Sequence, residues 1–489
     1  MLKEINVVWF KRDLRLKDHI PLVQAIDSKL PVVLIAFIEP SLSRSKTSDM
    51  RHWRFVRQSI QDLNQQLSPL NHKIHLLHEE VLPVFSSLLT KFRIRRVFSH
   101  EETGIGLTYE RDKEMKAFFS THKVLWKETP TNGVIRGIRK RNNWPKHWYS
   151  TMTAAQKHPE LSQLLTLKPE ELPPIFHQDL PDEFRKSARN FQEGGPSLAN
   201  QYLESFMTER FKNYNQHISK PALSRRSCSR LSPYLAWGNL SMRQVYQTAQ
   251  RAKNTGGPNK NLNSFLSRLR WHCHFIQKFE MMERYEKENI NPGYNELRTI
   301  WKEEKYLAWE EGKTGYPLVD ACIRCVKATG YLNFRMRSML VSFLTHHLWL
   351  DWKRGADFLA RQFLDFEPGI HYPQFQMQAG TTGYNTVRIY NPVKQSKDND
   401  PEGIFIRPWV AELHDLPLPF LHEPWKMTEM DQLQYQFKLG EDYPLPIVDI
   451  KETYKSASKA LWAQKKNPIV KKHAIKILAK QNEEERVNS

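Results

Sequence analysis

The chain has 489 residues, enough for two or three domains with buried cores. Lysine and arginine outnumber aspartate and glutamate by 73 to 53, and this excess favours polyanionic partners, with nucleic acid ahead of an anionic membrane. No apolar run reaches the roughly 20 residues of a membrane span, the charged start does not match a secretory signal, and four cysteines exclude a disulfide framework. We therefore expect a monomeric, cytoplasmic protein without a membrane partner.

Short apolar runs alternate with amphipathic segments in the first third of the chain. The runs predict buried parallel strands at 5–10, 32–38, 74–77, 94–98 and 124–126. Apolar residues recur at helical spacing over 51–67, and another helix is expected to begin near Tyr109. This alternation predicts an α/β domain with a doubly wound parallel sheet over residues 1–130. The first strand runs into "KRDLRLKDH" and lacks a glycine-rich turn for a dinucleotide, but a ligand can still bind at the carboxyl ends of the strands.

Residues 131–200 are rich in proline, lysine and histidine and only weakly periodic, so we expect a long connector there. Beyond it, segments such as "SFLSRLRWHCHFIQKFEMMER" and "RMRSMLVSFLTHHLWLDW" carry long apolar stripes at helical spacing. This pattern predicts an all-α C-terminal domain over residues 201–450. Residues 451–489 are basic and partly amphipathic, and they predict a surface helix that ends in a loose tail.

Two closely spaced cysteines in "VDACIRC" raise the question of a metal or redox site. Pro317 and Gly330 mark the start and the end of a predicted helix around them. Cys322 and Cys325 fall on its apolar stripe without a second pair nearby, which favours core cysteines that behave as small hydrophobic residues. In "WHCHF", residues 272–274 are adjacent and point in different directions on a helix, so they cannot chelate one ion together. The sequence therefore predicts no metal site.

The C-terminal half contains, in this order, the motifs "SCSRLSPYLAWGNLS", "EGKTGYPLVDACIRCVKATGYLNFRMRSMLVSFL", "LWLDWKRGADFLARQFLDFEPG" and "RIYNPVKQSKDNDPEGIFIRPWVAEL". They closely resemble the FAD-binding domain of the cryptochrome/DNA photolyase family. The opening "VVWFKRDLRLKDHIPLVQA" resembles the antenna domain of the same family. The resemblance implies an antenna-type α/β domain followed by a helical domain that binds FAD. It also leaves room for a second, antenna chromophore whose identity the sequence does not give.

The motif "SCSRLS" places Ser229 and Ser232 just before a helix that we expect to begin at Pro233. Hydroxyl groups, the Arg230 guanidinium and free helix N–H groups would suit an anionic pyrophosphate, although an ordinary capped helix explains the same residues. By resemblance, this is the site of the FAD phosphates.

Two charged residues, Arg337 and Asp365, stand inside otherwise apolar helical segments. Because an unpaired buried charge is costly, we expect them to pair, and by resemblance the pair lies beside the flavin. The resemblance also matches Glu367 with an acid near the flavin's pyrimidine ring, where the family more often has aspartate. In all it implies cofactor-binding roles for Tyr214, Cys228, Ser229, Arg230, Leu231, Ser232, Phe265, Arg337, Asp365, Phe366, Glu367 and His371.

In this family, FAD reduced by internal electron transfer absorbs blue or near-UV light and donates an electron to a pyrimidine dimer that is flipped out of duplex DNA. The resemblance therefore implies UV-damaged DNA as the partner. It implies DNA contacts at Trp271, Phe334, Arg335 and Met377. It implies catalytic positions at His371, Trp352, Trp301 and Arg268, and the two tryptophans match outer members of the electron-transfer chain.

The sequence departs from the family pattern close to the expected flavin. Counting from Asp365, His371 replaces the asparagine that the family has beside flavin N5, and a slip of one residue would put Tyr372 there. An imidazole titrates near neutrality, so it would change how the flavin radical is stabilised. Phe375 replaces the tryptophan that hands the flavin its electron, which predicts a broken relay.

Three further replacements affect the expected DNA side. Arg268 replaces a glutamate that hydrogen-bonds the dimer, Met377 replaces a tryptophan of the dimer-binding wall, and Phe334 replaces an asparagine. Two hypotheses therefore stay open. The protein is a DNA photolyase for cyclobutane dimers or (6-4) products, or it is a cryptochrome, a light-sensing flavoprotein without repair. The basic composition favours repair, and the lost glutamate and tryptophan favour sensing.

Overall fold

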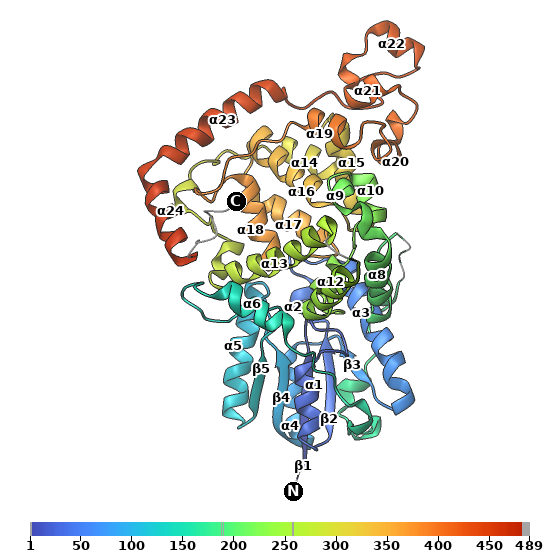
Figure 1. The fold of residues 1–489 in the computed structure, drawn as a ribbon, viewed down its shortest axis with the longest axis vertical. Coiled ribbons are helices and arrows are strands. Elements are labelled where there is room, and N and C mark those ends of the chain that lie inside the picture. The colour runs from blue at the N-terminus through green and yellow to red at the C-terminus, as the bar shows by residue number, and fades with distance from the viewer. Residues whose placement is uncertain (1, 187, 189, 257–258, 482–489) are drawn as a thin grey trace.

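The computed structural model describes residues 2–186, 188, 190–256 and 259–481. An α/β part and a helical part lie end to end, with the N-terminus at the far end of the α/β part (Figure 1). This is the predicted order, an α/β domain followed by an all-α domain.

Five parallel strands form one sheet in the order β3-β2-β1-β4-β5. Their bounds are β1 Lys3–Phe10, β2 Val32–Phe37, β3 Ile74–Leu77, β4 Phe92–His100 and β5 Leu125–Thr129. All five predicted strands are confirmed to within a few residues. Because the strand order reverses at β1 and β4, the carboxyl ends of these strands border the crevice where such sheets bind ligands.

Helices cover both faces of the sheet, which makes it doubly wound as predicted. They are α1 Ile20–Asp27 and α3 Met50–Leu67 on one face, and α4 Val81–Lys91 and α5 Gly106–Thr121 on the other. Successive side chains of β1 alternate between the two layers, so Val8 packs with the first pair of helices and Val7 with the second. The short helix α2 (Pro40–Ser43) follows β2 at the carboxyl ends of the strands.

The predicted connector contains a buried helix, α6 (Trp144–Thr153), and a short one, α7 (Asp182–Arg185). Trp144, Trp148 and Met152 are buried and lie four residues apart, so they form an apolar stripe. Proline, histidine and tyrosine between them hide this periodicity in the sequence. Further along, Val32 N–H donates to the carbonyl of Leu165 at 2.7 Å, so the connector returns along the sheet and packs as part of the fold.

The helical part is all-α apart from one isolated bridge among its described residues, which confirms the prediction. Its helices are α8 Pro196–Thr208, α9 Tyr214–His217, α10 Pro221–Ser227, α11 Ser232–Ala236, α12 Met242–Gly256, α13 Lys260–Glu280, α14 Glu303–Glu311, α15 Pro317–Thr329, α16 Phe334–Ser342, α17 Trp352–Gln362, α18 Pro368–Ala379, α19 Pro392–Asn399, α20 Ile406–Trp409, α21 Leu418–His422, α22 Glu429–Gln434, α23 Ile450–Lys466 and α24 Pro468–Gln481.

The "VDACIRC" segment lies in α15, which begins at Pro317 and ends before Gly330 in a left-handed conformation (φ 72°), as predicted. Cys322 and Cys325 are free and fully buried in the core of the helical part. The thiols therefore pack as small hydrophobic groups.

The predicted basic C-terminal helix is a pair of helices, α23 and α24, that curve round the side of the helical part (Figure 1). The expected loose tail falls on residues 482–489, outside the described residues. Across the part of the chain that the structure describes, no helix combines the length and the apolar character that a bilayer crossing requires.

Candidate functional sites

The loop between α10 and α11, residues 228–232, has an unusual backbone. Arg230 adopts a left-handed conformation (φ 58°), which is rare for a residue with a side chain. Arg210 donates to the carbonyls of Cys228 and Ser229, the latter at 3.3 Å, and so holds the loop. The helix begins at Ser232 and not at Pro233 as predicted, and Leu231 occupies the capping position without a side-chain hydrogen bond. Ser232 is therefore a residue of the first turn and does not cap the helix.

Arginines surround this loop. Burial raises the pKa of the Cys228 thiol to about 11, against the opposing charges of Arg210, Arg230 and Arg268. Burial also lowers the pKa of Arg230, and the like charge of Arg225 adds to that effect. Three or four guanidinium groups thus crowd one loop, an arrangement that favours a bound anion.

The Arg230 side chain is only partly satisfied. Its guanidinium lies 3.8 Å from the Tyr331 ring centre and donates to Gln192 at 3.0 Å, while its buried Nε has no hydrogen-bond partner. A buried donor without a partner costs free energy, so it suits a ligand that supplies an acceptor. The residues present therefore fit the pyrophosphate of FAD.

Arg337 and Asp365 form the predicted ion pair. Arg337 Nη2 lies 2.8 and 3.0 Å from the two carboxylate oxygens, and its guanidinium lies 3.9 Å from the Phe363 ring centre. Burial would raise the pKa of Asp365, but the charge of Arg337 holds it below its ordinary value, with a hydrogen bond from Ser232 in support. The carboxylate therefore stays ionised and ties α11, α16 and the start of α18 together.

His371 is half-buried on α18, whereas Tyr372 is fully buried. Because a carbonyl oxygen can only accept, His371 Nε2 carries the proton that it donates to the Ala356 carbonyl at 2.9 Å. Burial lowers the pKa of His371 to about 4, so the ring is neutral at pH 7 and its Nδ1 is an acceptor. Tyr372 instead stacks on Phe279, with ring centres 5.9 Å apart.

Phe375 lies between His371 and Trp352, with ring centres 5.5 and 6.3 Å from them. Trp352 is buried and donates from Nε1 to the side chain of Asn289 at 2.7 Å. Trp301 packs elsewhere, 5.1 Å from the Tyr306 ring. Phe375 thus lies between Trp352 and His371, as does Tyr372, whose ring centre lies 6.5 and 5.4 Å from theirs.

The predicted DNA-contacting residues include several that reach the surface. Trp271 on α13 is 44% exposed and Phe334 at the start of α16 is 42% exposed. Arg335 and Arg268 are also exposed, whereas Met377 is half-buried. Trp271 and Arg268 are three residues apart on one helix, so they share a face. Exposed aromatic rings and cations are therefore combined on α13 and at the start of α16.

The remaining predicted cofactor residues are largely apolar and buried. Tyr214 and Phe265 meet edge to face with ring centres 5.9 Å apart, and Leu231 is buried with them in one core cluster. Burial raises the pKa of Tyr214, and the charge of Arg268 opposes that rise. Phe366 lies 5.3 Å from the His371 ring. Tyr214 and Phe265 therefore pack on each other, and Phe366 packs against His371.

Glu367 caps the start of α18 and meets an arginine from the α/β domain. Arg12, which follows β1, donates to Glu367 Oε2 at 3.2 Å and to the Phe366 carbonyl at 3.1 Å. Burial raises the pKa of Glu367 to about 7, although Arg12 opposes the shift. Arg12 thus joins the two domains at an acid that was predicted to lie near the flavin.

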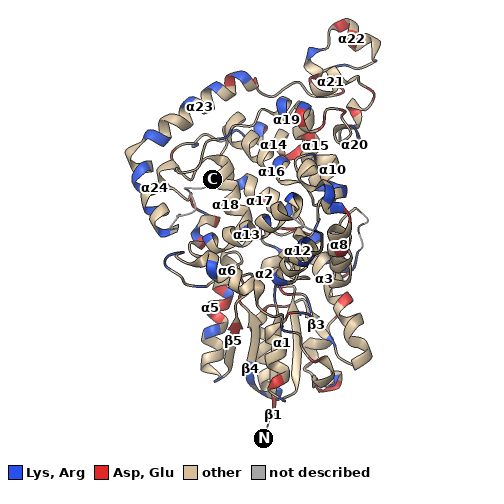
Figure 2. Cartoon of the chain, in the orientation of Figure 1, with Lys and Arg blue, Asp and Glu red and all other residues tan. Residues whose placement is uncertain are grey.

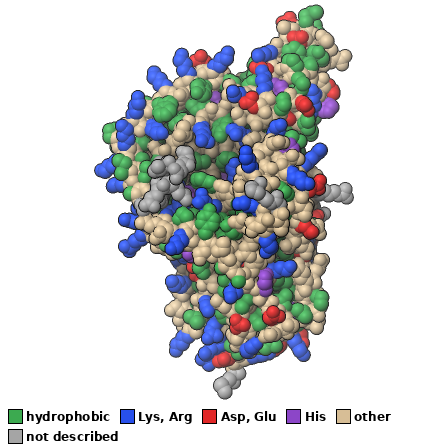
Figure 3. Space-filling model, in the orientation of Figure 1, with side chains coloured by type: hydrophobic (Ala, Val, Ile, Leu, Met, Phe, Trp, Pro, Cys, Tyr) green, Lys and Arg blue, Asp and Glu red, His purple; other side chains and the backbone are tan. Residues whose placement is uncertain are grey.

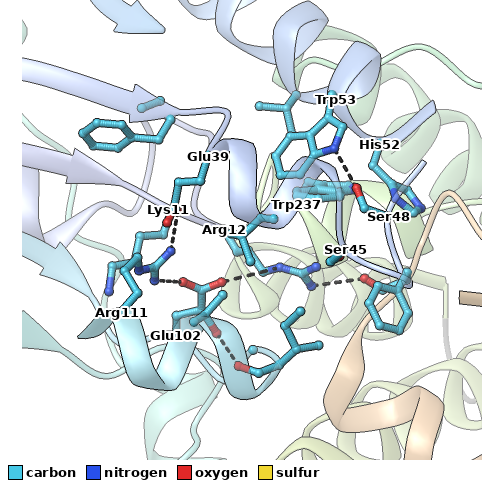
Figure 4. A pocket seen from close by; sticks show the side chains of 18 of the residues that line it. Lys11, Arg12, Glu39, Ser45, Ser48, His52, Trp53, Glu102, Arg111 and Trp237 are labelled. Carbon is cyan, nitrogen blue, oxygen red and sulfur yellow. Dashed lines mark hydrogen bonds and ion pairs between the residues drawn. The ribbon is translucent and has the colours of Figure 1, made fainter. Parts of the chain in front are cut away.

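A second site lies between the domains at the carboxyl ends of the strands (Figure 4). This interdomain pocket contains about 760 Å³ of space between its lining atoms, part of which is open to solvent. Arg111 lies 2.6 Å from both Glu39 and Glu102, and Arg12 lies 3.9 Å from Glu102. Its other labelled residues are mostly aromatic or hydroxyl-bearing, namely Ser45, Ser48, His52, Trp53 and Trp237 (Figure 4).

Asp13, His19 and His100 converge behind this pocket. The Asp13 carboxylate lies 2.7 Å from His100 Nδ1 and 2.9 Å from His19 Nε2, and all three side chains are buried. His19 Nδ1 accepts from the Leu22 backbone N–H, so its proton is on Nε2, which lies near Asp13 without a hydrogen bond of good geometry. The cluster therefore works as a hydrogen-bonded support for the start of α1.

Sequence reasoning did not predict the Glu39, Glu102 and Arg111 cluster of the interdomain pocket, and it missed three residues around the predicted cofactor site. Arg12 meets Glu367 across 355 positions, and Arg210 meets Cys228 across 18, which is still farther than a helical or turn pattern extends, so no local pattern predicts either contact. His272 was considered only as a metal ligand, yet the charge of Asp365 acts on it while burial lowers its pKa to about 4. Its place in "WHCHF", next to the predicted wall residue Trp271, was the one available signal.

Comparison with known proteins matches both parts of the chain. Residues 6–173 match the DNA photolyase model, and residues 265–463 match the model for the FAD binding domain of DNA photolyase. A deoxyribodipyrimidine photo-lyase of Alkalihalophilus pseudofirmus is 28% identical over 93% of this chain and 97% of its own length. A cryptochrome DASH of Gloeobacter violaceus is also 28% identical, over 91% of this chain and 93% of its own. The solved structure of a Synechocystis cryptochrome superposes with a TM-score of 0.83 at 23% identity, covering 94% of this chain and 99% of that one.

Proposed function

Since the chain belongs to the cryptochrome/DNA photolyase family, we propose that it is a DNA photolyase that repairs UV-induced pyrimidine dimers in a light-driven reaction. When bound, FAD supplies a light-absorbing electron donor. The observation that carries the proposal is the junction of a polar cofactor site with an exposed aromatic and cationic face. The first is built around Arg230 and the Arg337–Asp365 pair, and the second includes Trp271 and Arg335.

The chain's own residues hold the cofactor by charge and shape. Arg230, with Arg210 near it, neutralises the pyrophosphate. The Arg337–Asp365 pair keeps its geometry because each charge is satisfied by the other. The neutral His371 presents Nδ1 as an acceptor, which differs from the amide donor that the family pattern has at this position.

Damaged DNA is bound by the exposed face. Arg268 and Arg335 attract phosphates without regard to sequence, and Trp271 and Phe334 offer apolar surface to a dimer that has left the base stack. A dimer unstacks at lower cost than an intact base step, which gives the site its selectivity.

The interdomain pocket holds a second, light-harvesting chromophore, which members of this family carry. Its cations are already paired: Arg12 and Arg111 with Glu39 and Glu102, and Lys11 with Asp112. Little net charge is therefore left for a ligand. Trp53 and Trp237 supply ring surface, and Ser45 and Ser48 supply hydroxyl groups. A flat, nearly neutral heteroaromatic ring system suits this lining.

Illumination of the reduced, FAD-loaded protein with DNA that contains one defined lesion tests the repair function. Cyclobutane dimers and (6-4) products are measured separately, with a dark sample as the control. Loss of either lesion only in light is the expected result. Bound flavin without loss of any lesion would refute repair.

A cryptochrome-type photoreceptor without repair is the second candidate function. It is favoured by Arg268 and Met377, which stand where the family pattern has a dimer-binding glutamate and a tryptophan. The replacement of Met377 by tryptophan together with Arg268→Glu separates the two functions. If the variant repairs dimers and the wild type does not, the photoreceptor function holds.

A further inference from the structure

Helices α23 and α24 carry an unusually one-sided charge. From Ile450 to Gln481 the sequence has a single acidic residue, Glu452. Over the same stretch it has nine lysines: Lys451, Lys455, Lys459, Lys465, Lys466, Lys471, Lys472, Lys476 and Lys480. Figure 2 shows blue lysine and arginine positions along both helices, and Figure 3 shows blue side chains gathered along the same edge of the helical part. Helices that only face solvent usually carry charges of both signs, so the excess of lysine on this surface favours an anionic partner.

Four of these lysines form a stripe on α23. Lys451, Lys455, Lys459 and Lys466 are exposed, and with the 47% exposed Trp462 they recur at intervals of three or four residues. Residues with this spacing share one face of a helix. Within the described part of the chain, none of the four forms an ion pair, so all four charges are available to a partner.

The opposite face of the pair is fixed to the protein. Ala457 and Leu461 of α23 and Val470 of α24 are buried. Gln464 donates to the Gly293 carbonyl, and Lys465 donates to the Asn385 carbonyl at 3.2 Å. A helix that binds in a membrane interface must bury a continuous apolar face in the lipid. Here the apolar residues that form such a face are packed on the protein, and the exposed Tyr454, Trp462, Ile469 and Ile475 stand singly among lysines and polar residues. The outward lysines therefore suit a charged polymer in water better than a bilayer.

The helix pair also lies close to the end of α18, the helix that carries the predicted DNA-contacting residue Met377. It packs on the segment that follows α18, the helix of Met377: a Cβ added at Gly380 would lie 3.4 Å from the Leu461 side chain, and Asn291 donates to the Val470 carbonyl at 2.9 Å. The helix that carries the lysine stripe therefore packs beside the end of α18.

We infer that the lysine stripe of α23 binds the phosphate backbone of duplex DNA and extends the contact surface beyond the lesion. The inference rests on the proposed function for the identity of the polymer. Lysines four apart recur every ~6 Å, so α23 offers a row of cations about 25 Å long. Duplex DNA carries one negative charge per ~1.7 Å of its axis, so several phosphates fall within reach. Such contacts raise affinity equally for damaged and intact DNA.

The test replaces all four lysines of the stripe by glutamine in the full chain loaded with FAD. Binding to intact and to dimer-containing duplexes is measured between 50 and 300 mM salt, which are roughly the concentrations where counterion release dominates. We expect the slope of log K against log[salt] to become shallower by about 2 to 3.5, and affinity near physiological salt to fall at least about tenfold for both duplexes. A matched variant replaces Lys73, Lys91, Lys116 and Lys127, four exposed lysines of the α/β domain, and should leave the slope unchanged.

An unchanged salt slope in the stripe variant overturns the inference. An equal loss of DNA affinity in the matched variant also overturns it, because the loss would then follow from the lower net charge and not from the stripe. Vesicles of phosphatidylserine and phosphatidylcholine form a third arm. Loss of vesicle binding with intact DNA binding would assign the stripe to membranes and overturn the inference. If the wild type repairs no lesion in light and the slope still falls, the proposed function fails and the inference stands.

Discussion

The interdomain pocket and the 228–232 loop are both rich in arginine, but their charges are arranged differently. In the pocket, Arg111 lies between Glu39 and Glu102, so each cation has its acid within the protein. At the loop, several guanidinium groups crowd together, and the buried Nε of Arg230 has no partner. The difference shows that the charge of the ligand a site can bind depends on which of the site's own charges have no partner within the protein. The pocket suits a nearly neutral chromophore, and the loop suits a pyrophosphate.

The largest effect is expected in the pocket, on folding. Arg111→Met leaves Glu39 and Glu102 buried without their main cation and should lower the free energy of unfolding by about 3–5 kcal/mol at pH 7. The loss should shrink at low pH, because burial raises the pKa of Glu39 and its protonation removes one uncompensated charge. Urea unfolding at pH 5 and pH 7 measures both effects.

A second variant controls for the lost packing of the Arg111 side chain on Trp9. Adding Glu39→Gln to Arg111→Met should restore part of the lost stability, since one uncompensated carboxylate disappears. If the double variant is no more stable than the single one, the pocket's charges are not held by mutual pairing.

At the loop, the expected effect is on ligand binding. Arg230→Gly removes the cation but suits the left-handed backbone, so the fold should be kept while FAD binding weakens by about 10- to 100-fold, or ~1.5–3 kcal/mol. Flavin retained after gel filtration measures the loss. Arg226→Ala, which removes an exposed arginine four residues away, is the matched control and should retain the flavin. Equal retention in both variants would contradict a pyrophosphate site at Arg230.

Glu367 lies where the two sites meet, and its titration gives a third comparison. With a folded-state pKa of about 7 against an ordinary 4.5, the folded protein keeps a proton that the unfolded chain releases. The stability from this proton is present below pH ~4.5 and is lost as the pH rises through about 7. Relative to Glu367→Gln, the wild type should therefore lose about 2–3 kcal/mol between pH 5 and pH 8. A parallel pH profile for the two proteins would show that Arg12 keeps Glu367 ionised throughout.

The smallest effect concerns the aromatic route beside the flavin site. Phe375→Trp should speed photoreduction of bound FAD about tenfold, equivalent to ~1.4 kcal/mol, because it supplies a redox-active ring between Trp352 and His371. Phe375→Leu is the control and should photoreduce at the wild-type rate. If the wild type is already as fast as the tryptophan variant, the relay is not broken at this position.

The fold was largely predictable because its signals are local. Each strand is an apolar run, and the apolar stripes of α13 and α15 have helical spacing. Helix α6 was not predicted, because the stripe of Trp144, Trp148 and Met152 is interrupted by residues of low helix propensity. The start of α11 was expected one residue late, since proline occupies its second position and hides the true boundary.

The sites were only partly predictable. The pairing of Arg337 with Asp365 follows from the cost of a buried charge, and the structure confirms it. The roles of the individual residues toward FAD and DNA stay predictions. The clamp by Arg210 and the contact of Arg12 with Glu367 depend on tertiary folding, and the second joins residues 355 positions apart. A single sequence carries no local signal for such contacts.

The contacts of the Arg12 guanidinium limit which α/β domains from other proteins can replace the one in this chain. It belongs to the α/β domain, yet it donates to the Phe366 carbonyl and to Glu367 in the helical domain. A chimera that takes its α/β domain from another protein would leave the buried Glu367 without its cation, unless the donor protein has an equivalent arginine after its first strand. The two halves are therefore not interchangeable modules, and grafting a new light collector onto this flavin domain requires transplanting both ends of one hydrogen-bonded contact.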